Sequence, residues 1–322
     1  MIYYPAALAM TGFAYQQIAS YFDRKKYPPP GELIDVGGYN LHIQCQGERR
    51  QGIPTVIIET GIFDCSHSWQ LVQPEIAKFT QVVTYDRAGY GWSDQCSMPR
   101  TFDQMINELR TLLTKKGINP PYILVGHSLG GPIARYYQSQ YPEDVVGMVF
   151  VDALHVKAPE MSRIWMAACK VFSHLSFFGV SRLLFKCCPS FSANPKWTSE
   201  MQKAYIASHW AKSKALYACL EEADACEYNF NVLNQHKRSL KDMRITVISR
   251  DPDQQMHPSS AQAMEIERRY LEETNQGHVN ESDHARLVIA KGSGHLVQVD
   301  RPDIVIEEIY RQVEAAKTKS SE

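Results

Sequence analysis

Residues 123–132 read ILVGHSLGGP, and this stretch decides the fold of the 322-residue chain. Its first three residues predict a short buried strand, and the residues from Gly130 onward predict a helix that tolerates Pro132 in its first turn. The turn between them pivots on Ser128, which has a glycine two positions away on each side. Sharp turns bring backbones close together, where only small residues fit. We therefore predict a strained turn that projects the Ser128 hydroxyl from the sheet edge.

Such a turn is typical of a serine nucleophile. The N-terminus of the following helix points at the serine, and the Leu129 N–H is free to donate to a developing negative charge. A second donor is expected from the loop after the strand at residues 55–59, where Gly61 permits a turn that aims the Ile62 N–H inward. Leu129 and Ile62 are therefore the predicted oxyanion donors.

Strands and helices alternate along most of the chain. After a hairpin at residues 32–45, strands are predicted at 55–59, 81–86, 123–125, 147–152, 245–249 and 286–290, and helices at 69–79, 101–116 and 302–315. Continuous apolar strands alternating with helices predict an α/β fold with a doubly wound, mostly parallel sheet.

The alternation stops once, because residues 155–241 contain no strand candidate and are rich in bulky apolar side chains. This segment leaves directly after the strand that ends at Asp152, at the edge where open α/β sheets bind ligands. We therefore predict a helical lid. We expect residues 1–30 to form an N-terminal apolar helix and a Pro-rich spacer. Residues 31–154 and 242–318 should form the α/β core, and residues 155–241 the lid.

A serine hydroxyl is a poor nucleophile without a base within hydrogen-bond reach. His295 follows the last predicted strand in a glycine-rich loop, "KGSGHLVQVDRP", on the same sheet edge as Ser128. The acid of a triad is expected between them in chain order. Asp152 ends "GMVFVD", and Asp251 and Asp253 lie in "SRDPD". The pattern alone leaves the choice between these two sites open.

The bulk composition excludes some functions. The 34 basic and 35 acidic residues give a formal net charge of −1, so no basic field suits nucleic acid. The eight cysteines form no CxxC pair and show no zinc-binding spacing, which favours a reducing compartment. We expect no metal and no organic cofactor.

The first 22 residues carry no charge and precede Asp23, Arg24, Lys25 and Lys26. A spanning helix needs about 20 strongly apolar residues, and five less apolar residues dilute this run. Three interpretations stay open: a helix packed on the body, an interfacial helix, or a weak membrane anchor. We expect a cytoplasmic protein, or one held at a membrane peripherally or by its N-terminus with the catalytic body in the cytosol.

Taken together, these motifs resemble the α/β-hydrolase family over about residues 35–313, near its lidded esterase, haloalkane dehalogenase and epoxide hydrolase branches. "GHSLGG" and "GSGH" match closely, and "ETGIFDCSHSW" resembles the oxyanion loop, with Thr60 where the family usually has histidine. "YDRAGYGWSD" resembles a structural turn of the family. Dehalogenases and epoxide hydrolases of this type use an aspartate nucleophile, whereas Ser128 implies attack on a carbonyl carbon.

The resemblance also bears on the acid and the substrate. Serine esterases usually place the acid where "RDPD" stands, so the resemblance favours Asp253, with Asp152 and Asp251 as alternatives. The expected protein is a serine hydrolase that cleaves small carboxylic esters with an apolar group through an acyl-enzyme. A peptidase, a thioesterase or a carbon–carbon bond hydrolase on the same triad, or a slow-turnover small-molecule sensor, remains the alternative.

Overall fold

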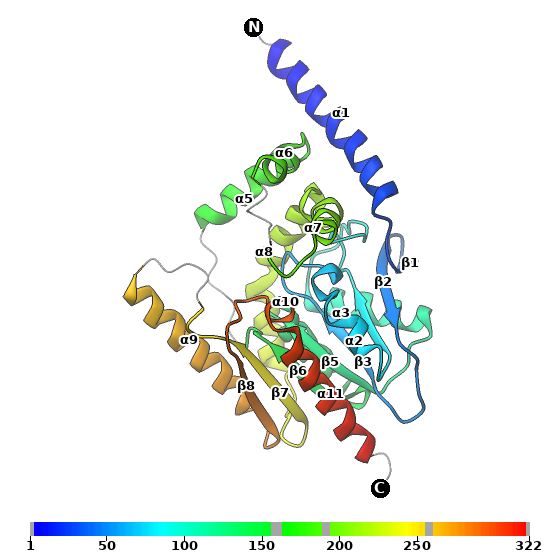
Figure 1. Cartoon of the computed structure of the whole chain (residues 1–322), viewed down its shortest axis with the longest axis vertical. Helices are drawn as coiled ribbons and strands as arrows, with labels where there is room; N and C mark the ends of the chain where they lie inside the picture. Colours follow the sequence, from blue (N-terminus) through cyan, green and yellow to red (C-terminus); the bar gives the residue numbers. More distant parts are fainter. Residues whose placement is uncertain (1–2, 156–162, 189–193, 255–259, 320–322) are drawn as a thin grey trace.

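The computed structural model describes residues 3–155, 163–188, 194–254 and 260–319, and its centre is an eight-stranded sheet (Figure 1). The strand order is β1-β2-β4-β3-β5-β6-β7-β8. The strands are β1 (Glu32–Asp35), β2 (Asn40–Gln46), β3 (Thr55–Glu59), β4 (Val82–Tyr85), β5 (Tyr122–His127), β6 (Val145–Val151), β7 (Arg244–Arg250) and β8 (Ala285–Ala290). Only β2 pairs antiparallel with its neighbours, and the other five pairs are parallel. This confirms the predicted fold class.

Helices cover both faces of the sheet, as the unbroken apolar strands require. One face packs against α3 (Phe102–Lys116), α4 (Gly130–Gln140) and part of α8 (Ser213–His236). The other packs against η1 (Ser66–Trp69), α2 (Gln73–Ile76), α10 (Val297–Asp300) and α11 (Pro302–Lys319). The core therefore lies in two layers, one on each side of the sheet.

The helices differ from the sequence prediction in two places. The helix expected at 69–79 is two short pieces, η1 and α2, because Pro74 begins a new helix at its N-terminus. Helix α9 (Ala261–Val279) was not predicted at all. It buries only Leu271, Asn275 and His278, so its sequence carries almost no apolar period.

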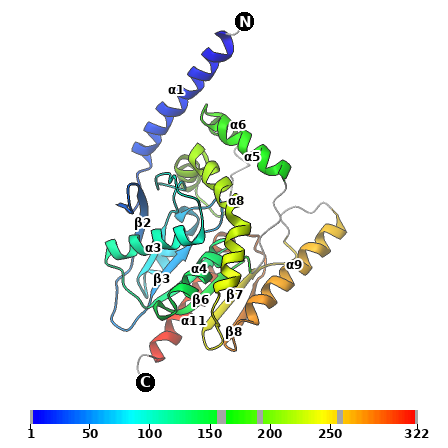
Figure 2. The ribbon, with the colours of Figure 1, turned by 180° about the vertical axis from the view of Figure 1, so that it is seen from behind.

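In chain order, five helical segments follow β6 and precede β7, and the described residues of this part of the chain form no strand. Figure 2 shows these helices from behind. They are α5 (Arg163–Ser176), α6 (Val180–Cys187), α7 (Ser199–Tyr205), η4 (Ile206–Trp210) and α8. Residues 156–162 and 189–193 of the predicted lid lie outside the described residues. We call this helical segment the insertion.

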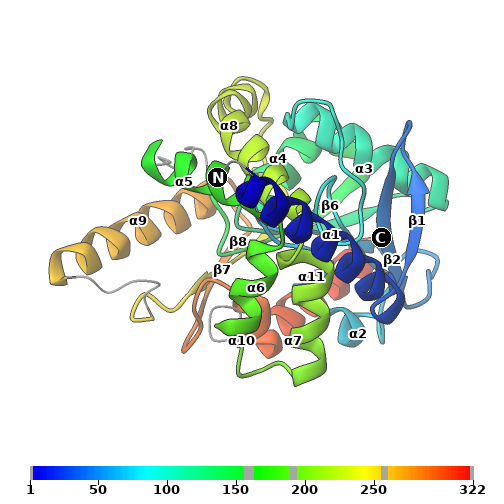
Figure 3. The same cartoon turned by 90° about the horizontal axis from the view of Figure 1, so that it is seen from above.

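Helix α1 (Tyr3–Lys26) projects from the body, and its nearest neighbours are helices of the insertion (Figure 3). Within the described part of the chain, no helix combines the length and the apolar character that crossing a bilayer requires.

Candidate active site

Ser128 lies at the strained tip of the turn between β5 and α4. Its φ of +52° is in the left-handed region that a non-glycine residue rarely adopts. Close backbone contacts explain why glycine is needed on each side of Ser128. A Cβ on Gly126 would lie 2.6 Å from the Gly130 carbonyl oxygen, and a Cβ on Gly130 would collide with the Glu59 carbonyl oxygen. The glycine pattern is therefore required by the close packing of β3, β5 and α4.

The loop after β3 packs directly on this turn. A Cβ on Gly61 would lie 3.1 Å from the Cβ of Ser128, so Gly61 allows the loop to approach the serine. Among the described residues, neither the Leu129 N–H nor the Ile62 N–H has a hydrogen-bond partner. Both predicted oxyanion donors thus belong to segments beside Ser128 with their N–H groups unused.

The carboxylate that contacts His295 is Asp152. The His295 Nδ1 lies 2.5 Å from Asp152 Oδ2. Asp152 is at the end of β6 with a φ of +40°, and its side chain is 2% exposed, whereas that of His295 is 28% exposed. Burial raises the pKa of Asp152, but the hydrogen bond and charge of His295 and the charge of Arg250 outweigh it and hold the pKa below its usual range. Asp152 is therefore an ionised partner for His295.

Asp253, which the resemblance favours as the acid, has other partners in this structure. Asp253 is 63% exposed, and its carboxylate accepts from Arg268 at 2.9 Å and lies 3.7 Å from Lys291. Asp251 instead accepts from the Gly292 N–H at 2.8 Å and from Lys291, so it holds the loop that carries His295. The three candidate acids thus occupy three different environments, and only Asp152 reaches the histidine.

Arg250 is a residue of this site that the sequence motifs did not indicate. Its Nη1 donates to Asp152 Oδ2 at 2.7 Å and its Nη2 to Glu267 of α9 at 2.6 Å. The sequence does contain a feature that could have indicated Arg250. It is a polar residue at the carboxyl end of β7, where parallel sheets place their functional groups. Arg250 therefore helps to fix the Asp152 carboxylate.

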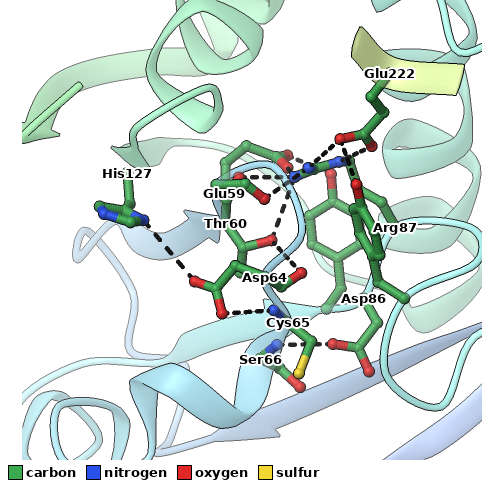
Figure 4. Close-up of polar contacts among 12 residues, drawn as sticks. Glu59, Thr60, Asp64, Cys65, Ser66, Asp86, Arg87, His127 and Glu222 are labelled. Carbon is green, nitrogen blue, oxygen red and sulfur yellow. Dashed lines mark hydrogen bonds and ion pairs between the residues drawn. The ribbon is translucent and has the colours of Figure 1, made fainter. Parts of the chain in front are cut away.

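A second buried arginine, Arg87, holds the loop after β3 (Figure 4). It donates to the carbonyl oxygens of Thr60 at 2.7 Å and Gly61 at 2.8 Å. Its charge is balanced by Glu59 at 2.7 Å and by Glu222 of α8 at 2.7 Å. Burial lowers the pKa of Arg87, but the two carboxylates raise it above its usual value. Arg87 therefore joins the loop beside Ser128 to the insertion.

His127 has a structural position, because it connects the turn at Ser128 to the loop that carries His295. Its Nε2 lies 2.9 Å from the His295 carbonyl oxygen, which can only accept, so Nε2 carries the proton. Burial and the neighbouring His295 lower the pKa of His127 to about 3. The other ring nitrogen faces Asp64 at 3.9 Å, and burial raises the pKa of Asp64 to about 6. A neutral histidine thus supports the position of His295.

Two cavities of about 360 and 350 Å³ lie at the base of α1, around Trp92 and Tyr27. The described residues that line them include neither Ser128 nor His295. Within the described residues, no cluster of three or more His, Cys, Asp or Glu side chains is arranged to hold a metal ion.

Comparisons with known proteins agree with this architecture. Residues 54–175 match the family model of the alpha/beta hydrolase fold. The probable transporter efuK of Hormonema carpetanum is 28% identical over 90% of this chain and 43% of its own length. The uncharacterized protein YqjL of Bacillus subtilis (strain 168) is 37% identical over 30% of this chain and 39% of its own length. The chain thus spans less than half the length of the first curated relatives it matches.

A solved structure gives the same result. The enol-lactonase from Burkholderia xenovorans LB400 superposes with a TM-score of 0.62 at 16% identity, covering 88% of this chain and all of that chain (100%). At this identity the likeness shows the fold. Together with the parallel sheet, the matched family model and the turn at Ser128, it shows that the chain has the α/β-hydrolase fold.

Proposed function

We propose that this protein is a serine hydrolase that cleaves carboxylic esters with an apolar group. The observation that carries the proposal is the 2.5 Å contact between His295 and Asp152 on the sheet edge that also presents Ser128 at a strained turn. A serine, a histidine and a buried carboxylate in this chain order form the triad of acyl-transfer enzymes on this fold.

The proposed reaction has two halves. His295 takes the proton of the Ser128 hydroxyl as Oγ attacks the carbonyl carbon, while Asp152 holds the Nδ1–H and stabilises the imidazolium. The Leu129 and Ile62 N–H groups donate to the oxyanion. The alcohol leaves with the proton from His295, and an acyl-enzyme remains. Water then attacks it with His295 as base, which releases the acid and regenerates Ser128.

Arg87 is proposed as a positioning residue. It touches no reacting atom, but it holds the carbonyl groups of Thr60 and Gly61, and so the direction of the Ile62 N–H. The insertion, through Glu222, supplies half of the charge that keeps Arg87 in place. This connection supports the proposal that the insertion acts as a lid, since a displacement of α8 would change the support of the oxyanion loop.

The test combines labelling with turnover. A fluorophosphonate probe should label the wild-type chain and not Ser128→Ala, and nitrophenyl esters from acetate to octanoate should show kcat/KM rising with chain length. Labelling without turnover on any ester would favour the slow sensor. Turnover of thioesters, peptides or activated ketones, but not esters, would favour the other triad hydrolases. An unlabelled wild-type chain would contradict the serine mechanism. The assignment of the chain to the lidded esterase and haloalkane dehalogenase-like branch of the fold stays a prediction.

A further inference from the structure

The face of α1 that packs against the protein is polar. Its polar members are Gln16, Ser20 and Asp23, and the other partly buried residues among those described in the helix are the small residues Ala9, Gly12 and Ala19. The side chains of Gln16 and Ser20 are buried, at 4% and 9% exposure. A helix on the surface of a water-soluble protein normally turns its apolar face inward, so this orientation is inverted.

Specific contacts hold α1 in this orientation. Arg182 of α6 donates to Asp23 at 2.5 Å, to Ser20 Oγ at 3.2 Å and to Gln16 Oε1 at 3.1 Å. Gln16 Nε2 in turn donates to the Ala211 carbonyl oxygen at 2.8 Å. Partners satisfy the polar groups that face inward, so the inversion is built into the packing of α1 on the insertion.

The apolar side chains of α1 point outward. The largest exposed fractions belong to Leu8 (76%), Met10 (68%), Phe22 (61%) and Ile18 (59%). The N-terminal part of the helix stands clear of the rest of the chain (Figure 1). These side chains therefore lack a neighbour within the described protein that could remove them from water.

Neighbouring helices extend this apolar area. The turn after α5 meets α1, because a Cβ on Gly12 would lie 3.2 Å from the Cβ of Phe178. Exposed apolar residues of α5, α6 and the turn between them are Ile164, Val171, Leu175, Phe177, Phe178 and Leu183. We call these residues, with Leu8, Met10, Phe13, Ile18, Tyr21 and Phe22 of α1, the α1 surface.

The charge of residues 3–26 and 163–188 is mainly positive. In residues 3–26 and 163–188 the sequence contains one carboxylate side chain, Asp23, and Arg182 binds it. The exposed cations there are Arg24, Lys25, Lys26, Lys170 and Lys186. The chain as a whole is almost neutral, so this local excess of positive charge is a property of the surface.

We propose that the α1 surface binds the interfacial region of an anionic lipid bilayer. The apolar side chains enter the boundary between headgroups and acyl chains, and the cations contact anionic headgroups. Tyr21 on α1 suits this boundary, because its ring is apolar and its hydroxyl can stay in water. Such binding needs no spanning helix and fixes the insertion against the membrane.

The charge distribution argues for lipid over a second copy of this chain. Two copies that buried their α1 surfaces together would bring the cations of residues 3–26 and 163–188 face to face, and the one carboxylate side chain of these ranges already pairs with Arg182. An anionic bilayer supplies both the apolar interior and the opposite charge. A second copy is therefore an outcome that the experiment must separate.

The experiment is flotation of the full chain with vesicles of phosphatidylcholine alone and of phosphatidylcholine with phosphatidylglycerol. We expect binding that is stronger on the anionic vesicles and falls with salt. Leu8→Glu with Ile18→Glu should lower the partition coefficient about tenfold or more. Ile266→Glu on α9 is the matched control, because Ile266 is 62% exposed and Ile18 is 59% exposed. It should bind like the wild type.

Charge reversal separates the two contributions. Lys25→Glu with Lys26→Glu should weaken binding to the anionic vesicles and leave the weaker binding to phosphatidylcholine unchanged. Thermal unfolding checks that each variant is folded. The proposal is overturned if the wild type does not float, or if Leu8→Glu with Ile18→Glu floats like it. Light scattering tests whether a second copy of the chain is the occupant instead. A dimer that forms without lipid and is dissociated by Ile18→Glu, together with no vesicle binding by the wild type or any variant, would also overturn the proposal.

Discussion

Two arginines show how differently this chain uses the same side chain. Arg87 is 1% exposed and binds two carboxylates and two carbonyl groups between β4 and the insertion. Arg182 is 12% exposed, and it joins α1 to α6 through one carboxylate and two neutral side chains. The first is enclosed by the core, whereas the second lies under a helix whose other side is apolar and exposed.

The difference teaches which contacts each region depends on. At the proposed catalytic edge, polar groups are buried with fixed partners, so removing one partner leaves an uncompensated charge. At the α1 contact, the ion pair of Arg182 and Asp23 is partly exposed, so its groups can exchange their partner for water at smaller cost. Catalytic-edge variants should therefore change turnover and stability, and α1 variants should change membrane binding with little effect on either.

The largest effect is expected for Ser128→Ala. Loss of the nucleophile should lower kcat on a nitrophenyl ester about 10³-fold or more without unfolding the protein. Ser139→Ala is the matched control, because Ser139 is a buried serine of α4, the helix that follows Ser128. Wild-type turnover by the Ser128 variant would rule out the mechanism, and vesicle binding should be equal in all three proteins.

The second effect distinguishes the candidate acids. Asp152→Asn should lower kcat about 10²- to 10⁴-fold, because His295 loses the carboxylate that orients it. Asp253→Asn should change kcat less than about twofold, since an exposed ion pair contributes little. Steady-state kinetics on one ester measure both. Equal losses, or a larger loss for Asp253, would contradict the assignment of Asp152.

The third effect tests the core arginine. Glu222→Gln leaves part of the Arg87 charge without a partner and should lower the free energy of unfolding by about 3 kcal/mol. If Arg87 also positions the oxyanion loop, kcat should fall while KM changes little. Urea unfolding and ester kinetics give the two values. Glu221→Gln, one position earlier on α8, is the control and should leave both near wild type.

The fourth effect is a dependence of stability on pH at Asp64. Burial raises the pKa of Asp64 to about 6, so the folded state binds more protons than the unfolded state between about pH 4 and 6. This contribution to stability is fully present below about pH 4 and is lost as the pH rises through 6. Relative to wild type, Asp64→Asn should therefore gain up to about 3 kcal/mol between pH 4 and 8. Urea unfolding at several pH values measures it, and a constant difference between the two proteins would contradict the raised pKa.

The smallest effect is expected for Arg182→Gln. Loss of the contact with Asp23 should cost about 1 kcal/mol or less and leave ester turnover unchanged. It should nevertheless loosen α1, so amide hydrogens of residues 12–23 should exchange faster while those of β5 do not. Unchanged exchange in α1 would mean that the apolar contacts of Gly12 and Tyr15 hold the helix without the arginine.

The sequence by itself determined the fold and the turn at Ser128. Period and composition predicted the strands, because strands buried on both faces must be apolar throughout. The glycines at 126 and 130 predicted the turn, because their small size is a local requirement of the backbone that the close contacts with β3 and α4 explain. Helix α9 escaped prediction for the opposite reason, since it buries too few apolar residues to leave a period.

Only the tertiary structure decided which carboxylate meets His295. Asp152, Asp251 and Asp253 all follow strands at the same sheet edge, so they are equivalent in local sequence. Their roles differ because β6 lies between β5 and β7 and turns Asp152 toward the histidine loop, while Asp253 points to solvent. The contact of Arg87 with Glu222 and the inverted orientation of α1 likewise depend on residues more than 100 positions apart. Local patterns cannot encode such contacts, since they arise only when distant segments pack together.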